Sequence, residues 1–222
     1  MYGKLYIVAT PIGNLTDISQ RALETLKNVN LIFAEDTRVT QKLLSRYDIE
    51  TKVFSYHHHS SENKKFEILA RLQKGESIAL VTDAGTPGVS DPGNELLDLL
   101  YDLGVDVQIT PIPGPSSLSA ALSICGFNTS KFIFAGFFPK KKANKWLNTY
   151  FTQDITTIYF DSPHRLIKNL EKIKDQIGDR RVFVARELTK LHEETFRGPV
   201  SEVLEELKAS NPKGEVVVVV EA

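Results

Sequence analysis

Short apolar runs alternate with amphipathic helical segments along the first half of the chain, and this alternation constrains the fold more than any other feature. Leu5–Ala9 and Ile78–Thr82 are typical of strands, and Glu62–Leu72 has helical periodicity and ends close to Gly75. Because a strand–loop–helix order needs crossover connections, it predicts an α/β fold with a mainly parallel sheet. The other elements expected here are strands over Leu31–Ala34, Lys52–Tyr56 and Val105–Thr110, and helices over Ser19–Lys27, Thr37–Arg46 and Glu95–Leu103.

Three prolines within Pro111–Pro115 are expected to stop any regular element, which makes this segment the best candidate for a domain boundary. We therefore predict an N-terminal α/β domain over residues 1–112 and a C-terminal domain over residues 113–222. Strands follow one another more closely in the second half, which predicts a mixed α+β arrangement there. Its expected elements are helices over Ser117–Ser123, His164–Ile177 and Ser201–Ala209, a helix carrying Lys140–Lys145, and strands over Phe132–Ala135, Thr157–Phe160, Arg181–Arg186, Thr195–Phe196 and Glu215–Val220.

The composition is that of a globular protein, since 41% of the 222 residues are hydrophobic and 25% are charged. Lys and Arg number 27 and Asp and Glu 28, so the net charge of −1 excludes a generic phosphate-backbone binder but not a local basic cluster. Cys125 is the single cysteine, so a reducing cytoplasm is the expected location. The N-terminus lacks an export signal and no apolar run approaches the ~20 residues of a membrane helix, so we expect neither export nor membrane insertion.

Three loops rich in Gly and Pro follow expected strands: Thr10–Asn14, Asp83–Gly93 and Pro111–Ser117. Ligands of parallel α/β sheets bind at the carboxyl ends of the strands. Glycines there let the backbone approach a ligand, and prolines keep a loop rigid. One such loop is more often an ordinary turn, whereas three loops at one edge of a sheet favour a small-molecule site.

Several other kinds of site lack their motifs. The first loop has a single glycine, Gly13, and Pro11 prevents an immediate helix start, which argues against a dinucleotide site. The sequence contains no P-loop motif, no Gly-x-Ser-x-Gly motif and no Cys/His cluster with zinc spacing. His192–Glu194 lacks the second His of a metalloprotease helix. No metal site is therefore expected.

Seven motifs in a fixed order identify a family. They are Val8–Asn14, Ala34–Arg38, Ser55–His59, Thr82–Gly93, Pro113–Ser116, Asp161–Arg165 and Ala185–Glu194. Together they closely resemble the tetrapyrrole methylase superfamily, in its branch that modifies ribosomal RNA, over essentially the whole chain. The resemblance implies two α/β domains with S-adenosylmethionine bound in the cleft between them, and a homodimer. It also implies methylation of a cytidine ribose 2′-hydroxyl in 16S rRNA of the small ribosomal subunit.

The same resemblance assigns the residues that hold the methyl donor. One loop contributes Asp83, Ala84, Gly85, Thr86 and Gly88 to the pocket, and a second loop contributes Gly114, Ser116 and Ser117. Pro11 and Gly13 form the floor of the pocket. Backbone groups of tight loops can satisfy adenine and amino-acid atoms, and the positive N-terminus of the helix over Ser117–Ser123 suits a carboxylate. Ser116 and Ser117 are also good helix caps. Gly214 lets the backbone close over the adenine or forms a plain turn.

The charged residues of the motifs are the candidates for catalysis: Asp36, Arg38, His164, Arg165, Glu187 and Lys190. A ribose hydroxyl is a weak nucleophile at neutral pH, so positioning and a nearby base or cation would accelerate transfer. Asp36 or Glu187 is the candidate proton acceptor. Lys190 or Arg165 is the candidate cation that lowers the hydroxyl pKa or holds a phosphate. For each residue the alternative is a surface or interdomain ion pair.

Two further groups are candidates for contact with RNA. On a strand, His57 and His59 would share a face, yet no third metal ligand is identifiable, so an RNA-facing loop is the preferred interpretation of His57–His59. Lys140, Lys141, Lys142 and Lys145 are either a solvated helix start or a phosphate contact. Of Phe137, Phe138 and Trp146, which could stack on a base, at least two are expected in the core.

The sequence departs from the family pattern at two places. His58 stands where an acidic residue is usual, and many members continue past the last strand with a small helical extension, which matters if that extension touches RNA. Two alternative functions are a methylase of a tetrapyrrole or other small acceptor, and a non-catalytic ribosome-assembly module that keeps the cofactor fold. The first predicts a large apolar acceptor trough, and the second predicts binding to small subunits without turnover.

Overall fold

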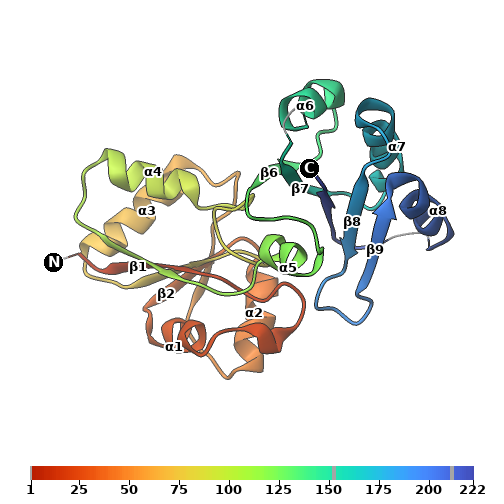
Figure 1. Ribbon diagram of the computed structural model, residues 1–222. Coiled ribbons are helices and arrows are strands. Elements are labelled where there is room, and N and C mark those ends of the chain that lie inside the picture. The colour runs from red at the N-terminus through yellow and green to blue at the C-terminus, as the bar shows by residue number, and fades with distance from the viewer. Residues whose placement is uncertain (1, 152–153, 211–212) are drawn as a thin grey trace. The chain divides into compact units, whose positions relative to one another are not determined.

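The computed structural model describes residues 2–151, 154–210 and 213–222 (Figure 1). It divides into two compact units, Met1–Ser116 and Ser117–Ala222. The second unit thus begins a few residues after the predicted start at residue 113.

The first unit is built on a parallel sheet. Its five strands have the order β3-β2-β4-β1-β5, and every neighbouring pair is parallel, which confirms the predicted sheet. The strands are β1 (Lys4–Val8), β2 (Leu31–Ala34), β3 (Val53–Ser55), β4 (Ile78–Val81) and β5 (Gln108–Ile112). All five therefore end at the same edge of the sheet.

Helices cover both faces of this sheet, α1 and α2 on one face and α3 and α4 on the other (Figure 1). Ala22 and Leu26 of α1 and Leu43 and Leu44 of α2 join one buried cluster. The opposite cluster contains side chains of α3 and α4, among them Ile68. The bounds are α1 (Gln20–Asn28), α2 (Thr37–Arg46), α3 (Glu62–Gln73) and α4 (Asn94–Asp102), with a 3-10 turn η1 (Leu15–Asp17) after β1.

The expected stop at Pro111 is wrong, because β5 continues through Pro111 to Ile112. Pro111 stands opposite Ile7 of β1 in the parallel register. A proline cannot donate a backbone hydrogen bond, but β5 is an edge strand with a neighbour on one side alone, so the missing N–H need not leave a gap in the ladder. The predicted strand over Val105–Thr110 is accordingly shifted toward the C-terminus.

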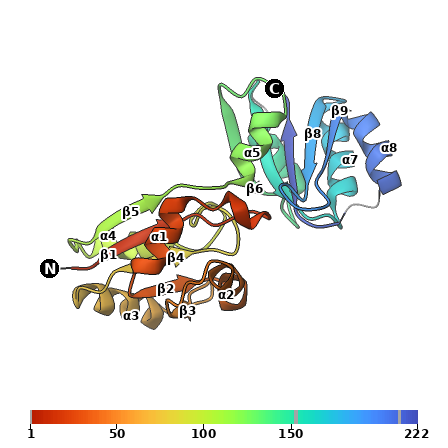
Figure 2. The same cartoon turned by 90° about the horizontal axis from the view of Figure 1, so that it is seen from below.

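The second unit has a mixed sheet, as predicted. Its strand order is β6-β7-β10-β8-β9, with β6 and β7 parallel, β10 antiparallel to both β7 and β8, and β9 antiparallel to β8. The elements are α5 (Ser117–Ile124), β6 (Phe132–Phe137), α6 (Ala143–Tyr150), β7 (Thr156–Asp161), α7 (Leu166–Ile177), β8 (Arg181–Arg186), β9 (Glu194–Pro199), α8 (Val200–Ser210) and β10 (Val216–Val220). Figure 2 shows α5 on one side of this sheet and α7 and α8 on the other.

The basic segment Lys140–Lys145 lies mostly outside its expected helix, since α6 begins at Ala143. Lys142 precedes the helix in a left-handed conformation (φ 60°), which an α-helix cannot continue through. Phe138 is buried and packs on Trp146, whose indole N–H donates to the carbonyl oxygen of Ala135 (3.2 Å). These two aromatic residues are therefore core residues, as expected for two of the three.

Within residues 2–151, 154–210 and 213–222, no helix is both long and apolar enough to span a membrane.

Candidate functional site

The loops that follow β1 and β4 are joined by backbone hydrogen bonds. The N–H of Thr10 donates to the carbonyl oxygen of Gly85 (2.9 Å), and the N–H of Gly85 donates back to Thr10 (3.0 Å). The hydroxyl of Thr10 donates to the carbonyl oxygen of Thr82 (3.1 Å). This bridge extends the two parallel strands into their loops and fixes the position of Gly85.

The loop after β5 joins the same group. The N–H of Ala9 donates to the carbonyl oxygen of Ile112 (3.1 Å), and Gly114 comes so close to Ala9 that a Cβ on Gly114 would lie 3.1 Å from the Ala9 Cβ. A Cβ on Gly85 would lie 3.7 Å from Ile12 Cγ2 and 3.9 Å from the oxygen of Pro115. The three glycine and proline loops predicted to form one site therefore lie within contact distance of one another.

The loop over Asp83–Gly93 holds its shape through its own contacts. Gly85 and Gly88 have φ angles of +82° and +86°, which side chains rarely adopt. The side-chain amide of Asn94 donates to the carbonyl oxygen of Gly88 (2.9 Å). Because these contacts form within the chain itself, the loop is preorganised for a ligand, which reduces the entropy lost on binding.

The predicted donor residues differ in exposure. Pro11 and Gly85 are buried, Asp83, Gly13 and Gly114 are exposed, and the half-buried residues are Ala84, Thr86, Gly88, Ser116 and Ser117. All except Ser117 belong to the first unit, and Ser117 is the first residue of α5 in the second.

Three carboxylates lie at the ends of β2 and β4, which are neighbours in the sheet. Asp83 accepts a hydrogen bond from the N–H of Asp36 at Oδ1 (2.9 Å). Burial and the negative charge of Asp83 raise the pKa of Glu35, against the opposing effects of His58 and His57. Glu35 is a residue that the sequence interpretation missed, although it lies inside the Ala34–Arg38 motif.

Asp36 differs from Glu35 because it pairs with Arg38. Its Oδ1 accepts from the backbone N–H (2.8 Å) and the Nε (3.0 Å) of Arg38, and it caps the first turn of α2. These hydrogen bonds lower the pKa of Asp36 to about 2. A carboxylate with so low a pKa is a weak base, so this pairing argues against Asp36 as the proton acceptor.

The substitution Arg38→Gln is expected to raise the pKa of Asp36 from about 2 toward 3.8, because the side-chain hydrogen bond is the largest cause of the shift. A carboxylate whose pKa is lowered by folding contributes stability above its unfolded pKa and loses that contribution as the pH falls through the folded pKa. The variant should therefore be less stable than the wild type above about pH 4, and this difference should disappear as the pH falls from about 4 to 2. An NMR titration of the carboxylate carbons measures the pKa directly, and an unchanged Asp36 pKa would contradict the assignment.

The candidates of the second unit gather at one edge of its sheet. Val216 of β10 pairs with Asp161 at the end of β7 and with Arg186 at the end of β8. The segments that follow β7 and β8 therefore begin at the same edge of the sheet, on either side of β10. They carry the predicted residues His164, Arg165, Glu187 and Lys190.

A buried carboxylate organises the segment after β7. Asp161 accepts hydrogen bonds from the N–H of Ser162 (2.7 Å) and from the side-chain amide of Asn169 (2.9 Å). Burial raises the pKa of Asp161, and these donors together with Arg165 oppose the rise. Arg165 lies 3.9 Å from Asp161 and reaches the carbonyl oxygen of Phe138 (3.4 Å), whereas His164 is exposed. The Asp161–Arg165 motif thus positions a cation at the edge of the sheet.

Glu187 has a structural contact that explains Gly214. Its Oε1 accepts from the N–H of Glu215 (2.8 Å) and from the Nζ of Lys190 (2.9 Å). Burial raises the pKa of Glu187, but these donors outweigh it and lower the pKa overall. Lys190 also pairs with Glu215 (3.0 Å), and against the effect of burial the two carboxylates raise its pKa. Glu187 is therefore a poor proton acceptor, and Lys190 is a fixed cation.

Gly214 leaves the space that the Glu187 side chain fills, because a Cβ on Gly214 would lie 2.2 Å from Glu187 Cδ. Gly214→Ala is expected to cost about 2–3 kcal/mol of unfolding free energy, since it adds left-handed backbone strain and displaces the Glu187 hydrogen bonds. Gly178→Ala is the matched control, because Gly178 has the same φ of +85° and an open space at its Cβ. Urea unfolding should give the control a loss of about 1–2 kcal/mol, from the backbone strain alone. Equal losses in the two variants would contradict the role of Glu187.

The three histidines that follow β3 lie at a turn. His57–His59 follow β3, all three are exposed, and His57 Nδ1 accepts from the N–H of His59 (3.2 Å). They lie in a loop and turn and not on a strand, in agreement with the loop that the sequence favoured. Over the described ranges, no three His, Cys, Asp or Glu side chains are grouped so that they could hold a metal ion. A cavity of about 230 Å³ lies beside this turn and is lined by Tyr56, His57, His58, Gly88, Ser90, Asp91, Pro92, Gly93, Asn94 and Glu95.

Known proteins resemble this chain in sequence and in fold. Residues 4–222 match the family of tetrapyrrole (corrin/porphyrin) methylases. The ribosomal RNA small subunit methyltransferase I of Thermotoga maritima is 47% identical over 98% of this chain and 97% of that protein. The protein of the same name from Bacillus subtilis is 43% identical over 99% of this chain and 75% of that protein.

A solved structure gives the same result for the fold. The X-ray structure of the cobalamin biosynthetic enzyme cobalt precorrin-4 methyltransferase superposes with a TM-score of 0.70 at 20% identity, over 98% of this chain and 94% of that one. This likeness concerns the fold alone. The family expected from the seven motifs is confirmed by the family match and the two relatives. The chain therefore belongs to the tetrapyrrole methylase family, in the group of proteins named ribosomal RNA small subunit methyltransferase I.

Proposed function

We propose that this chain transfers a methyl group from S-adenosylmethionine to the ribose 2′-hydroxyl of a cytidine in 16S rRNA of the small ribosomal subunit. The observation that carries this proposal is the 47% identity, over nearly the full length of both chains, with a protein named ribosomal RNA small subunit methyltransferase I. The cytidine 2′-hydroxyl as acceptor rests on the resemblance of the seven motifs.

The loops of the first unit fit the methyl donor. Bound S-adenosylmethionine supplies a methyl group on a positively charged sulfur. Gly85 and Gly114 are places where a Cβ would enter the space between the loops, so their backbone can approach a ligand closely. The exposed carboxylate of Asp83 favours a cation nearby. We assign donor binding to these loops of the first unit.

Glu35 is a better proton acceptor than the two predicted candidates, Asp36 and Glu187. A general base works best when its pKa lies near the operating pH, and the pKa of Glu35 is raised whereas those of Asp36 and Glu187 are lowered. Glu35 would take the proton of the hydroxyl as the hydroxyl oxygen forms a bond to the methyl carbon and the bond from that carbon to the donor sulfur breaks. Asp36 then acts by capping α2 and holding Arg38.

The second unit would supply cations to the RNA. Lys190 is held by Glu187 and Glu215, and Arg165 is held beside Asp161. Both are fixed before any ligand binds, which suits contact with a phosphate. His164 is exposed at the same edge and remains a candidate contact. Lys140, Lys141, Lys142 and Lys145 are exposed and remain candidates for phosphate contact.

The proposal includes the setting in which the enzyme acts. Its substrate assigns it to the cytoplasm, in agreement with a single, buried cysteine. A homodimer is proposed from the resemblance, and light scattering at micromolar concentration tests it, since a mass of one chain would contradict it.

Labelled donor and small subunits from a strain that lacks the modification test the reaction. Label on the ribose of one 16S cytidine is the expected result, and the absence of label on any 16S ribose would overturn the proposal. A control for RNA docking is this chain fused to the C-terminal extension of a related protein. Calorimetry with S-adenosylhomocysteine separates an inactive module from an enzyme, because binding at tens of micromolar is expected for the enzyme alone. Turnover of a precorrin without RNA would indicate a small-molecule methylase.

A further inference from the structure

Helix α2 carries a stripe of three cations, of which the functional assignments above use only Arg38. Arg38, Lys42 and Arg46 follow one another at intervals of four residues, which places them on one side of the helix, and all three are exposed. The helix contains no acidic residue. At a rise of 1.5 Å per residue the stripe is about 12 Å long.

Acidic side chains neutralise these cations less than they neutralise the cations of α3, the next helix along the chain. There, Lys64 pairs with Glu67, Lys65 with Glu95, and Arg71 with both Glu67 and Glu76. On α2, Arg38 pairs with Asp36 and keeps 86% of its side chain exposed. Among the ion pairs of the described residues, none includes Lys42 or Arg46. A chain with a net charge of −1 thus keeps a local positive surface.

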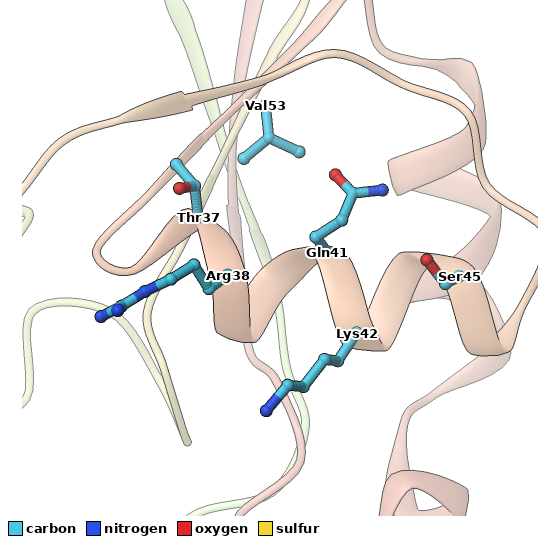
Figure 3. A pocket seen from close by; sticks show the side chains of 6 residues that line it. All are labelled: Thr37, Arg38, Gln41, Lys42, Ser45 and Val53. Carbon is cyan, nitrogen blue, oxygen red and sulfur yellow. The ribbon is translucent and has the colours of Figure 1, made fainter.

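A groove of about 750 Å³ accompanies the stripe, and Figure 3 shows the side chains that line it. They are Thr37, Arg38, Gln41, Lys42, Ser45 and Val53. Gln41 extends toward Val53 of β3, whereas Arg38 and Lys42 extend outward from the helix (Figure 3). Hydroxyl and amide groups between cations are the usual partners of phosphate and ribose oxygens.

The stripe begins at the candidate site. Asp36, the cap of α2, donates its N–H to Asp83 of the donor loop, and Arg38 is two residues further along the helix. The helix therefore leads away from the carboxyl edge of the sheet where the methyl group would be transferred.

The structure disfavours a membrane as the partner of this surface. A helix that binds a lipid surface inserts its apolar face. Leu43 and Leu44 of α2 are buried in the core against the sheet and are not available for insertion. Val39 is the one exposed apolar residue of α2, and a single valine is too small a face for insertion, so this cationic and polar surface fits an RNA backbone.

We propose that the α2 stripe, Arg38, Lys42 and Arg46, binds the phosphate backbone of the substrate RNA beside the acceptor nucleotide. The inference rests on the proposed function and adds a docking surface to it. The contacts are to phosphate and sugar, so they position the strand and do not read its sequence.

The test uses the full chain with Lys42→Gln and Arg46→Gln combined, and leaves Arg38 intact. The control combines Lys27→Gln and Lys74→Gln, which removes the same charge from exposed positions of the same unit. Binding to small subunits is measured at saturating S-adenosylhomocysteine between 50 and 200 mM salt. We expect the slope of log affinity against log salt to fall by about 1.4, at ~0.7 for each phosphate of a single strand that is no longer neutralised. Affinity near physiological salt should fall about tenfold or more, whereas S-adenosylhomocysteine affinity stays within about twofold.

The outcomes separate the docking surface from the proposed reaction. If the stripe variant binds subunits like the control variant while the wild type transfers methyl groups, the docking surface is wrong and the proposed function stands. If the wild type binds subunits and the stripe variant loses affinity, but no methyl group is transferred, the docking surface stands and the reaction is wrong. Binding of the wild type to anionic lipid vesicles, with no binding to small subunits, would overturn the RNA assignment.

Discussion

Gly85→Leu is expected to lower the affinity for S-adenosylhomocysteine by about 100-fold or more, a loss of roughly 2.7 kcal/mol. Gly85 lies where the loops after β1, β4 and β5 meet, since its absent Cβ would face Ile12 at 3.7 Å and Pro115 at 3.9 Å. Those distances leave ordinary room for one carbon, so the remainder of a leucine side chain would occupy the space between the loops. Isothermal titration calorimetry measures the affinity.

The control for this variant is Gly104→Leu. Gly104 also has a positive φ, +59°, in the same unit, but nothing lies within 4 Å of its Cβ. Both variants bear backbone strain of about 1–2 kcal/mol, so their thermal stabilities should fall by similar amounts. Only the Gly85 variant should lose ligand affinity. An unchanged affinity in a folded Gly85 variant would remove these loops from the donor site.

Glu35→Gln is expected to lower kcat by about 100-fold or more, within the range typical of general bases, while the affinity for S-adenosylhomocysteine is retained. Burial and the charge of Asp83 raise the pKa of Glu35, so the wild-type kcat should increase with pH as this carboxyl loses its proton above 4.5. The variant should lack this acidic limb. The measurement is the pH profile of methyl transfer under single-turnover conditions.

Asp36→Asn is the comparison for Glu35. Asn is as good a helix cap as Asp, so α2 should remain in place. Because the pKa of Asp36 is about 2, the residue is ionised throughout the working range and contributes no pH dependence there. The Asn variant should keep the acidic limb and lose far less activity. A larger loss at Asp36 than at Glu35, or a limb that persists in the Glu35 variant, would reverse the two assignments.

Much of the fold could be predicted because it depends on local patterns. The apolar run over Leu31–Ala34 is a strand with the predicted bounds, and the helix over Thr37–Arg46 also has its predicted bounds. The three loops after β1, β4 and β5 could be predicted to meet, because parallel strands all end at one edge of a sheet. The prediction that Pro111 ends the strand was wrong, because whether a strand tolerates proline depends on its neighbours in the sheet.

The chemistry of the charged residues could be predicted only in part. Glu187 and Lys190 were candidates by their motifs, but their pKa values depend on Glu215, which lies about 25 residues further along the chain. Glu35 is a candidate because Asp83 follows β4, the strand adjacent to β2, and raises its pKa together with burial. Cations at intervals of four form no run in the sequence, so the stripe on α2 became visible only on the helix.

The sequence by itself determined the family, the order of strands and helices, and the glycine and proline loops, because each follows from motifs or from periodicity over a few residues. The tertiary structure decided which residues around those loops act together. It set Glu35 beside Asp83, joined Lys190 to Glu215, and filled the space at Gly214 with the side chain of Glu187. The physical reason is that the pKa of a carboxyl and the space available to a side chain depend on atoms that are close in space, and the chain brings these together from distant positions.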